Sequence, residues 1–165
     1  MNNEEIKVIV DKMCNVLEKI GQGMGLEAST GQAARYEIAS FMMYLSASDG
    51  KILWEEAKII SEMCDLNLTP ESMESFINDQ KFYTPEFETK VPPMYELMVS
   101  VDNTLFEEGE TISGSGIMLD TYQTVGAALI KSDDDVDENE LTDYNKYLTM
   151  MVDYRNANYK GAKAQ

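Results

Sequence analysis

The sequence has no histidine among its 165 residues, so it lacks the side chain that most often acts as a general acid or base near neutral pH. This absence excludes Ser-His-Asp and Cys-His triads and the common zinc sites that contain histidine. The two cysteines, Cys14 and Cys64, lie far apart in the sequence and form no Cys-x-x-Cys pair, which is typical of a reduced, intracellular protein. We therefore expect a protein that is not an enzyme.

Basic residues are also scarce. Thirteen Lys and Arg stand against thirty Asp and Glu, which gives a net charge of −17. Binding nucleic acid, or lying on an anionic membrane, requires basic patches that this composition barely supplies. We expect no nucleic-acid partner, and we expect cations or other proteins as binding partners.

Long hydrophobic runs are missing as well. The longest uninterrupted apolar run is the five residues from Phe41 to Leu45, whereas a membrane span needs roughly 20. The start of the chain, with Glu4 and Glu5, lacks the basic segment and apolar stretch of a signal peptide. We expect no membrane insertion and a cytoplasmic location.

The apolar residues that are present recur at intervals of three and four, the spacing of one helix face. No segment shows the alternation of a strand, so the sequence predicts an all-α fold, a compact bundle of about six to eight helices in a single domain over 1–160. Residues 109–116 read as the main polar loop and the most mobile segment, and 161–165 as a disordered tail. The predicted helices cover about 3–20, 32–47, 54–66, 70–80, 93–108, 117–131 and 138–154, with a short helix near 85.

Two acidic turns follow one pattern, SDGKILWEE over 48–56 and SDDDVDENE over 132–140. Asp49 and Asp133 each end an apolar helix, and Glu56 and Glu140 follow seven residues later in the first turn of the next. A duplicated helix-turn-helix unit would explain this arrangement. Turn formation and helix capping account for every residue type in both turns, whereas a metal site additionally requires the carboxylate oxygens to converge.

The first turn resembles the hallmark of the TerB-like family, which is named for bacterial tellurite resistance. That hallmark begins with Phe, six unspecified residues, a small residue and Asp-Gly. An aliphatic residue follows two positions after the glycine, and Glu comes four positions after the aliphatic residue. The stretch from Phe41 to Glu56 matches this pattern. The second copy departs from it, because Asp134 replaces the glycine. The resemblance implies a compact helical domain with pseudo-twofold repeats, acidic clusters that hold a divalent metal, and membership in stress-response or defence assemblies.

Carried over to this sequence, the resemblance implies a divalent cation, Ca²⁺, Mg²⁺ or Mn²⁺, at the acidic turns. Two further acids in the second turn are added for their proximity alone. The candidate metal ligands are Asp49, Glu56, Asp133, Glu140, Asp135 and Asp137.

A rival site is an EF-hand loop, because Asp133, Asp135 and Asp137 alternate as its first ligands do. The rest of the template fails, since position 6 is Glu138 instead of Gly and position 12 is Tyr144 instead of Glu. The EF-hand is therefore set aside.

Twelve methionines and a single tryptophan remain to be placed. Most methionines fall on the apolar helix faces and read as core, although part of the set could line an adaptable interaction groove. Trp54 reads as a core plug at a helix start, and Ile52 or Val136 as plugs beneath the two turns.

Two functions stay open at this point. The first is a non-enzymatic TerB-like binding or adaptor domain in stress response or defence, with a divalent cation at two acidic turns. The alternative is an acidic protein-interaction module of the immunity or inhibitor type, with no metal requirement, whose charge steers it to a basic partner.

Overall fold

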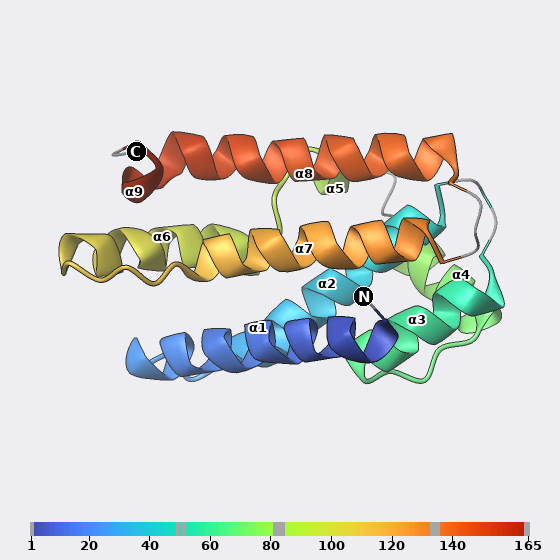
Figure 1. Cartoon of the computed structure of the whole chain (residues 1–165), viewed down its shortest axis with the longest axis horizontal. Coiled ribbons are helices and arrows are strands. Elements are labelled where there is room, and N and C mark those ends of the chain that lie inside the picture. Colours follow the sequence, from blue (N-terminus) through green and yellow to red (C-terminus); the bar gives the residue numbers. More distant parts are fainter. Residues whose placement is uncertain (1, 49, 51, 81–84, 133–135, 164–165) are drawn as a thin grey trace.

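The apolar stripes of the sequence form helices throughout the residues that the computed structural model describes, which are 2–48, 50, 52–80, 85–132 and 136–163. The predicted all-α bundle is confirmed, and within these residues every regular element is a helix (Figure 1). The elements are α1 (Asn3–Gly23), α2 (Thr30–Ser46), α3 (Trp54–Cys64), α4 (Pro70–Gln80), α5 (Pro85–Glu88), α6 (Pro93–Glu107), α7 (Gly114–Ile130), α8 (Glu138–Asn158) and α9 (Lys160–Lys163).

Helix α2 is the centre of the bundle, because α1, α3, α4, α6, α7 and α8 all pack against it. Every residue from Phe41 to Ser46 is buried, so the longest apolar run of the sequence is a helix segment surrounded on all sides. Around it, α8, α7 and α1 run side by side with α6 level with α7, and α3 and α4 cover one end (Figure 1).

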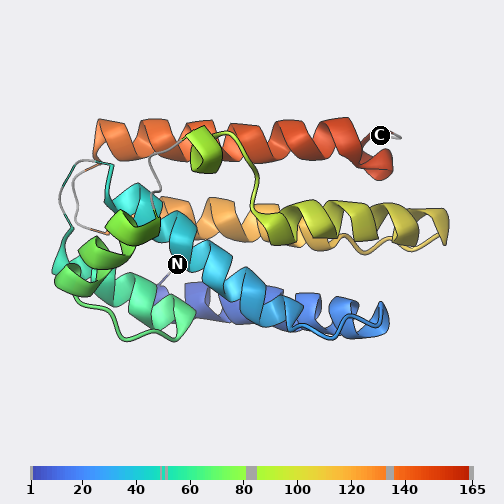
Figure 2. The same ribbon diagram turned by 180° about the vertical axis from the view of Figure 1, so that it is seen from behind.

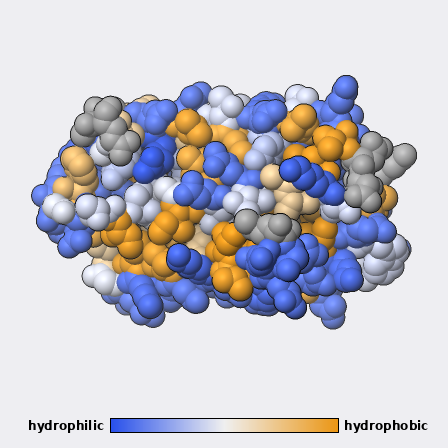
Figure 3. Space-filling view, viewed as in Figure 1, coloured by the Kyte–Doolittle hydropathy of each residue, from blue (hydrophilic) through white to orange (hydrophobic). Residues whose placement is uncertain are grey.

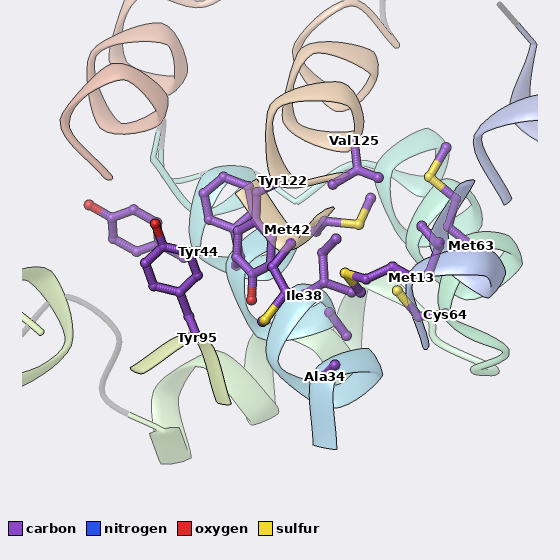
Figure 4. Packing of buried hydrophobic residues seen from close by; sticks show 14 of the residues in the cluster. Met13, Ala34, Ile38, Met42, Tyr44, Met63, Cys64, Tyr95, Tyr122 and Val125 are labelled. Atoms are coloured by element: carbon purple, nitrogen blue, oxygen red, sulfur yellow. The ribbon is translucent and has the colours of Figure 1, made fainter. Parts of the chain in front are cut away.

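Methionine and tyrosine side chains fill much of the core (Figure 4). Met13 of α1, Met42 of α2 and Met63 of α3 are fully buried in this core, and the tilted rings of Phe41 and Tyr122 have their centres 4.9 Å apart. The interpretation of most methionines as core residues is confirmed, since thioether chains fit the irregular gaps between crossing helices. On the face seen in Figure 3, hydrophobic side chains show between α1 and α7 and along part of α8, and hydrophilic ones cover the edge along α1.

Helix boundaries recur at an interval of 84 residues. Helices α2 and α7 are both 17 residues long and begin at 30 and 114. In the same way α3 and α8 begin at 54 and 138, and α1 and α6 end at 23 and 107.

The turn that follows α1 also recurs after α6. Gly25 and Gly109 take positive φ angles of 74° and 84°, which only glycine adopts without strain. The N–H groups of Leu26 and Glu110 each donate a 2.9 Å hydrogen bond to the carbonyl five residues earlier, which closes the helix end. These correspondences support the hypothesis of a duplicated unit, which stays a prediction.

The predicted polar loop over 109–116 is shorter than expected. Ser113 caps α7 by accepting a 3.0 Å hydrogen bond from the Gly116 N–H, so the helix begins at Gly114. Gly114 is buried, and a side chain there would lie 2.8 Å from the Met98 sulfur. The second half of this segment is therefore a packed helix start.

Other differences concern single side chains and the chain end. Trp54 is 62% exposed and Val136 is 52% exposed, so neither is the core plug that the sequence suggested. Ile52 does pack against the core. The tail predicted over 161–165 is helical as far as Lys163, because α9 packs against α6 and α8.

Candidate functional site

The acidic residues proposed as metal ligands fall into two groups. Asp49, Asp133 and Asp135 lie outside the described residues. Glu56 is 2% exposed, and its carboxylate accepts a 2.9 Å hydrogen bond from the Leu53 N–H at the start of α3. This is the capping role that turn chemistry alone predicts.

The second turn shows the same use of its acids. Asp137 is the N-cap of α8, where its Oδ1 accepts hydrogen bonds from the Asn139 and Glu140 N–H groups at 2.8 and 3.1 Å. Glu140 is 3% exposed in the first turn of that helix. The described members of both turns are therefore placed where negative charge favours a helix start.

The structure does bring the start of the first turn against α8. Ser48, just after the end of α2, donates a 2.6 Å hydrogen bond to Asp143 in the first turns of α8. Asp143 was missed from the sequence, although its place three residues after Glu140 puts both on one helix face. Within the part of the chain that the structure describes, no three acidic or cysteine side chains converge as metal ligands would.

A separate feature is a pocket of about 600 Å³ between α2, α8 and the segment from α5 to the start of α6. Figure 2 shows this segment passing from α8 to the start of α6, with α2 beside it. The volume lies in the range of ordinary ligand sites. Its apolar wall is formed by Tyr36, Phe87, Val91, Tyr147, Met150 and Tyr154.

Glu37 supplies a carboxylate to this pocket from the middle of α2. Both of its oxygens lie near the Met94 N–H, at 3.0 and 3.1 Å, so Glu37 caps the start of α6 from another helix. Burial raises the pKa of Glu37 to about 7, and the hydrogen bond from Met94 offsets only part of that rise. A half-buried acid that titrates near neutral pH at a pocket wall marks a candidate functional residue.

Among the described residues that line the pocket, the other charged groups are Lys90 and Glu96, both exposed. Lys146 is engaged nearby with Glu88 at 2.7 Å, and Tyr44 donates to the same carboxylate at 3.3 Å. This pair ties α8 to α5 and holds one wall of the pocket in place.

Sequence reasoning missed this site for identifiable reasons. Glu37 sits beside Ile38 on a helix whose apolar stripe was the only signal used. The stretch from 81 to 93 has no clear period, yet Pro92 and Pro93 mark a chain that cannot continue a helix without interruption. An acid opposite an unsatisfied helix start is visible only once α2 and α6 are packed.

A buried polar network joins α6, α7 and α8 elsewhere. Asp102 is fully buried and accepts hydrogen bonds from the Gly114 N–H at 2.7 Å and from Ser113 and Ser115 at 2.7 and 2.5 Å. Arg155 donates to both serine hydroxyls at 3.0 Å. Because these groups hydrogen-bond to one another, we assign the network a structural role, which is to hold the three helices together.

The buried cysteines are poor nucleophiles. Burial raises the pKa of the Cys64 thiol to about 12 and also raises that of Cys14, so both thiols stay protonated at neutral pH. The pocket at Glu37, in contrast, brings together two kinds of group that suit ligand recognition, an aromatic wall and carboxylates.

Comparison of the chain with protein families, with curated proteins and with solved structures found no match. In the described part of the chain, none of the helices has the length and apolar character needed to cross a bilayer.

Proposed function

We propose that this chain is a non-enzymatic, TerB-like adaptor domain, and that a partner protein docks at the pocket between α2, α5, α6 and α8. The observation that carries the proposal is the 600 Å³ pocket, which joins an aromatic wall to a carboxylate on a strongly acidic chain. Concave, mostly apolar sites with a few convergent polar groups are the usual places of binding.

The exposed ring of Tyr36 supports a protein partner. Its side chain is 55% exposed at the pocket edge, and its ring meets Phe76 edge-on at 5.9 Å. Tyrosines in this setting commonly anchor protein interfaces, because the ring contributes large contact area at low entropy cost. We base the proposed role in stress response or defence on the resemblance of the acidic turns to the TerB-like family.

A photo-cross-linker tests this proposal. We expect benzoylphenylalanine at position 36 to capture one partner protein in cells, and the same group at Val8, which is 65% exposed on α1, not to capture it. The captured protein is then purified and its affinity measured by calorimetry. Equal capture from both positions would contradict docking at the pocket.

A blocked pocket supplies the matched variant. Ser40 lines the pocket, and its hydroxyl bonds the carbonyl of Tyr36 at 3.0 Å. Thr124, 84 residues later on α7, makes the same bond to Asp120 at 2.9 Å, away from the pocket. We expect Ser40→Tyr to abolish partner binding and Thr124→Tyr to preserve it.

Divalent cation binding at the acidic turns is the second proposed function. The observation that favours it is the 2.6 Å bond from Ser48 to Asp143, which holds the first turn against the helix that follows the second. We expect chelator-treated protein to bind Ca²⁺, Mg²⁺ or Mn²⁺ in calorimetry, and Asp49→Asn and Asp133→Asn to lose that binding. Absence of heat in the unmodified protein would leave the turns as capping structure and favour the adaptor function without metal.

A further inference from the structure

Four aromatic rings converge on the pocket from three elements. Tyr36 comes from α2, Phe87 from α5, and Tyr147 and Tyr154 from α8. Phe87 and Tyr147 are stacked with ring centres 5.5 Å apart, and Tyr36 is exposed enough to offer its face to a ligand. Aromatic faces carry partial negative charge and attract cations that sit over them.

Acid outweighs base around these rings. Glu37 lies within the wall and Glu96 at the edge, and among the described lining residues the basic one is Lys90, which is exposed. Among the described residues, the Glu37 oxygens share one N–H donor, Met94, so lone pairs remain for a second donor. A cation with N–H donors matches both the rings and this carboxylate.

We propose that the pocket receives an arginine side chain from a basic segment of the partner protein, its guanidinium paired with Glu37 and stacked on the aromatic wall. This inference rests on the proposed docking function and names the chemistry of the partner. Arginine fits better than lysine because its planar, weakly hydrated fork both stacks on rings and pairs with a carboxylate. The net charge of −17 steers a basic segment to this chain, and 600 Å³ accommodates the side chain with its neighbours.

Binding of a guanidinium is coupled to the proton on Glu37. Because the arginine stabilises the ionised carboxylate, its affinity rises with pH as Glu37 ionises near pH 7. Among the described lining residues, the charged groups that share the pocket with Glu37 are Lys90 and Glu96. The buried tyrosines beside Glu37, Tyr122 and Tyr147, have raised pKa values and stay neutral in this range.

Methionine methyl NMR of the full chain tests the inference. Met150 lines the pocket and Met24 is an exposed methionine at the end of α1, so the two ¹³C-labelled methyl groups report on the site and on a remote surface. The probes are blocked tripeptides with leucine on either side of arginine or of citrulline, its neutral isostere. We expect the arginine probe to shift Met150 saturably, to leave Met24 unmoved, and to bind about tenfold more tightly than the citrulline probe.

Two variants locate the charge. We expect Glu37→Gln to weaken the arginine probe about tenfold and to remove the rise in affinity between pH 6 and pH 8. Glu62→Gln removes the same charge from α3, outside the pocket. We expect it to leave unchanged both the affinity for the arginine probe and the rise of that affinity with pH. The dispersed methionine spectrum of each variant shows that it is folded.

Equal binding of the two probes, or an unchanged affinity in Glu37→Gln, would overturn the inference. Loss of probe binding in Ser40→Tyr supports the location. If neither probe moves Met150 while the partner still cross-links at position 36, the arginine chemistry is wrong and the docking function stands.

Discussion

Glu18 and Asp102, which are 84 residues apart, occupy equivalent positions. Each carboxylate accepts a hydrogen bond from the hydroxyl of the serine that caps the next helix, and a second one from the backbone N–H two residues after that serine. The serine bonds measure 2.6 and 2.7 Å. The environments differ, because Asp102 is fully buried and Glu18 is only half-buried.

The first prediction follows from that difference. Asp102→Ala leaves the Gly114 and Ser115 N–H groups buried without an acceptor, and we expect the free energy of unfolding to fall by about 3–4 kcal/mol. Glu18→Ala should cost much less, since water replaces the lost carboxylate. Urea unfolding of both variants measures the two losses, and equal losses would contradict the structural role given to Asp102.

The second prediction concerns acid stability. Burial alone would raise the pKa of Asp11, but hydrogen bonds from Lys7 and Arg35 outweigh it and hold that pKa below its usual value. The free energy that these hydrogen bonds add to the folded state is fully present at pH values above the unfolded-state pKa of Asp11, near 4. It is lost as the pH falls through the lower folded-state pKa. We expect Asp11→Asn to be less stable than the unmodified chain at pH 6.

That deficit should shrink steadily below pH 4, as the unmodified chain loses the same interaction. Urea midpoints between pH 6 and pH 2.5 measure it. Asp153→Asn, which removes an exposed acid of α8, serves as the control for net charge. A deficit that stays constant with pH would count against the ion-pair origin.

The third prediction concerns Asp65, which ends α3 with a φ angle of 54°. Its carboxylate pairs with Lys7 at 3.1 Å and Arg35 at 3.3 Å, so the side chain compensates for an unfavourable backbone. Asp65→Ala and Asp65→Gly both remove these pairs, but only glycine relaxes the backbone. We expect the glycine variant to be more stable by about 1 kcal/mol in urea unfolding; the reverse order would contradict strain at this position.

The fourth prediction tests the close approach of α1 and α2. A Cβ at Gly31 would lie 2.4 Å from the backbone oxygen of Cys14, which cannot move aside, whereas one at Gly23 would meet open space. We expect Gly31→Ala to cost about 2–3 kcal/mol. Gly23→Ala at the end of α1 should be neutral or stabilising, by up to about 0.5 kcal/mol. Thermal unfolding compares them, and a tolerated alanine at position 31 would refute the tight crossing.

The fifth prediction compares two buried tyrosines. The Tyr122 hydroxyl has no hydrogen-bond partner among the described residues, while the Tyr95 hydroxyl donates to the Met151 carbonyl at 2.7 Å. We expect Tyr122→Phe to raise the free energy of unfolding by about 1 kcal/mol and Tyr95→Phe to lower it by about as much. The same sign for both substitutions in urea unfolding would contradict these assignments.

Local signals predicted the helices well. Helix α4 has the predicted bounds, 70–80, because Thr69 and Pro70 supply a cap and a first helical position. The burial of a single residue depends on neighbouring elements and could not be predicted from the sequence. Trp54 is a large apolar residue yet faces solvent, and Gly114 lies in a polar stretch yet is buried. The acidic turns were found by repetition, whereas the pocket at Glu37 has walls from α2, α5, α6 and α8, which no single stretch of sequence contains.

The position of α2 at the centre of the bundle has a consequence for synthesis on the ribosome. Its neighbours α1 and α3 are made early, but Tyr122 and Tyr147, which cover Phe41, follow about 80 to 105 residues later. At about 5–20 residues per second, the nascent first half waits roughly 5–20 s with part of α2 uncovered. The uncovered helix is therefore the segment of the growing chain that a chaperone would bind, and folding is completed only when α8 emerges.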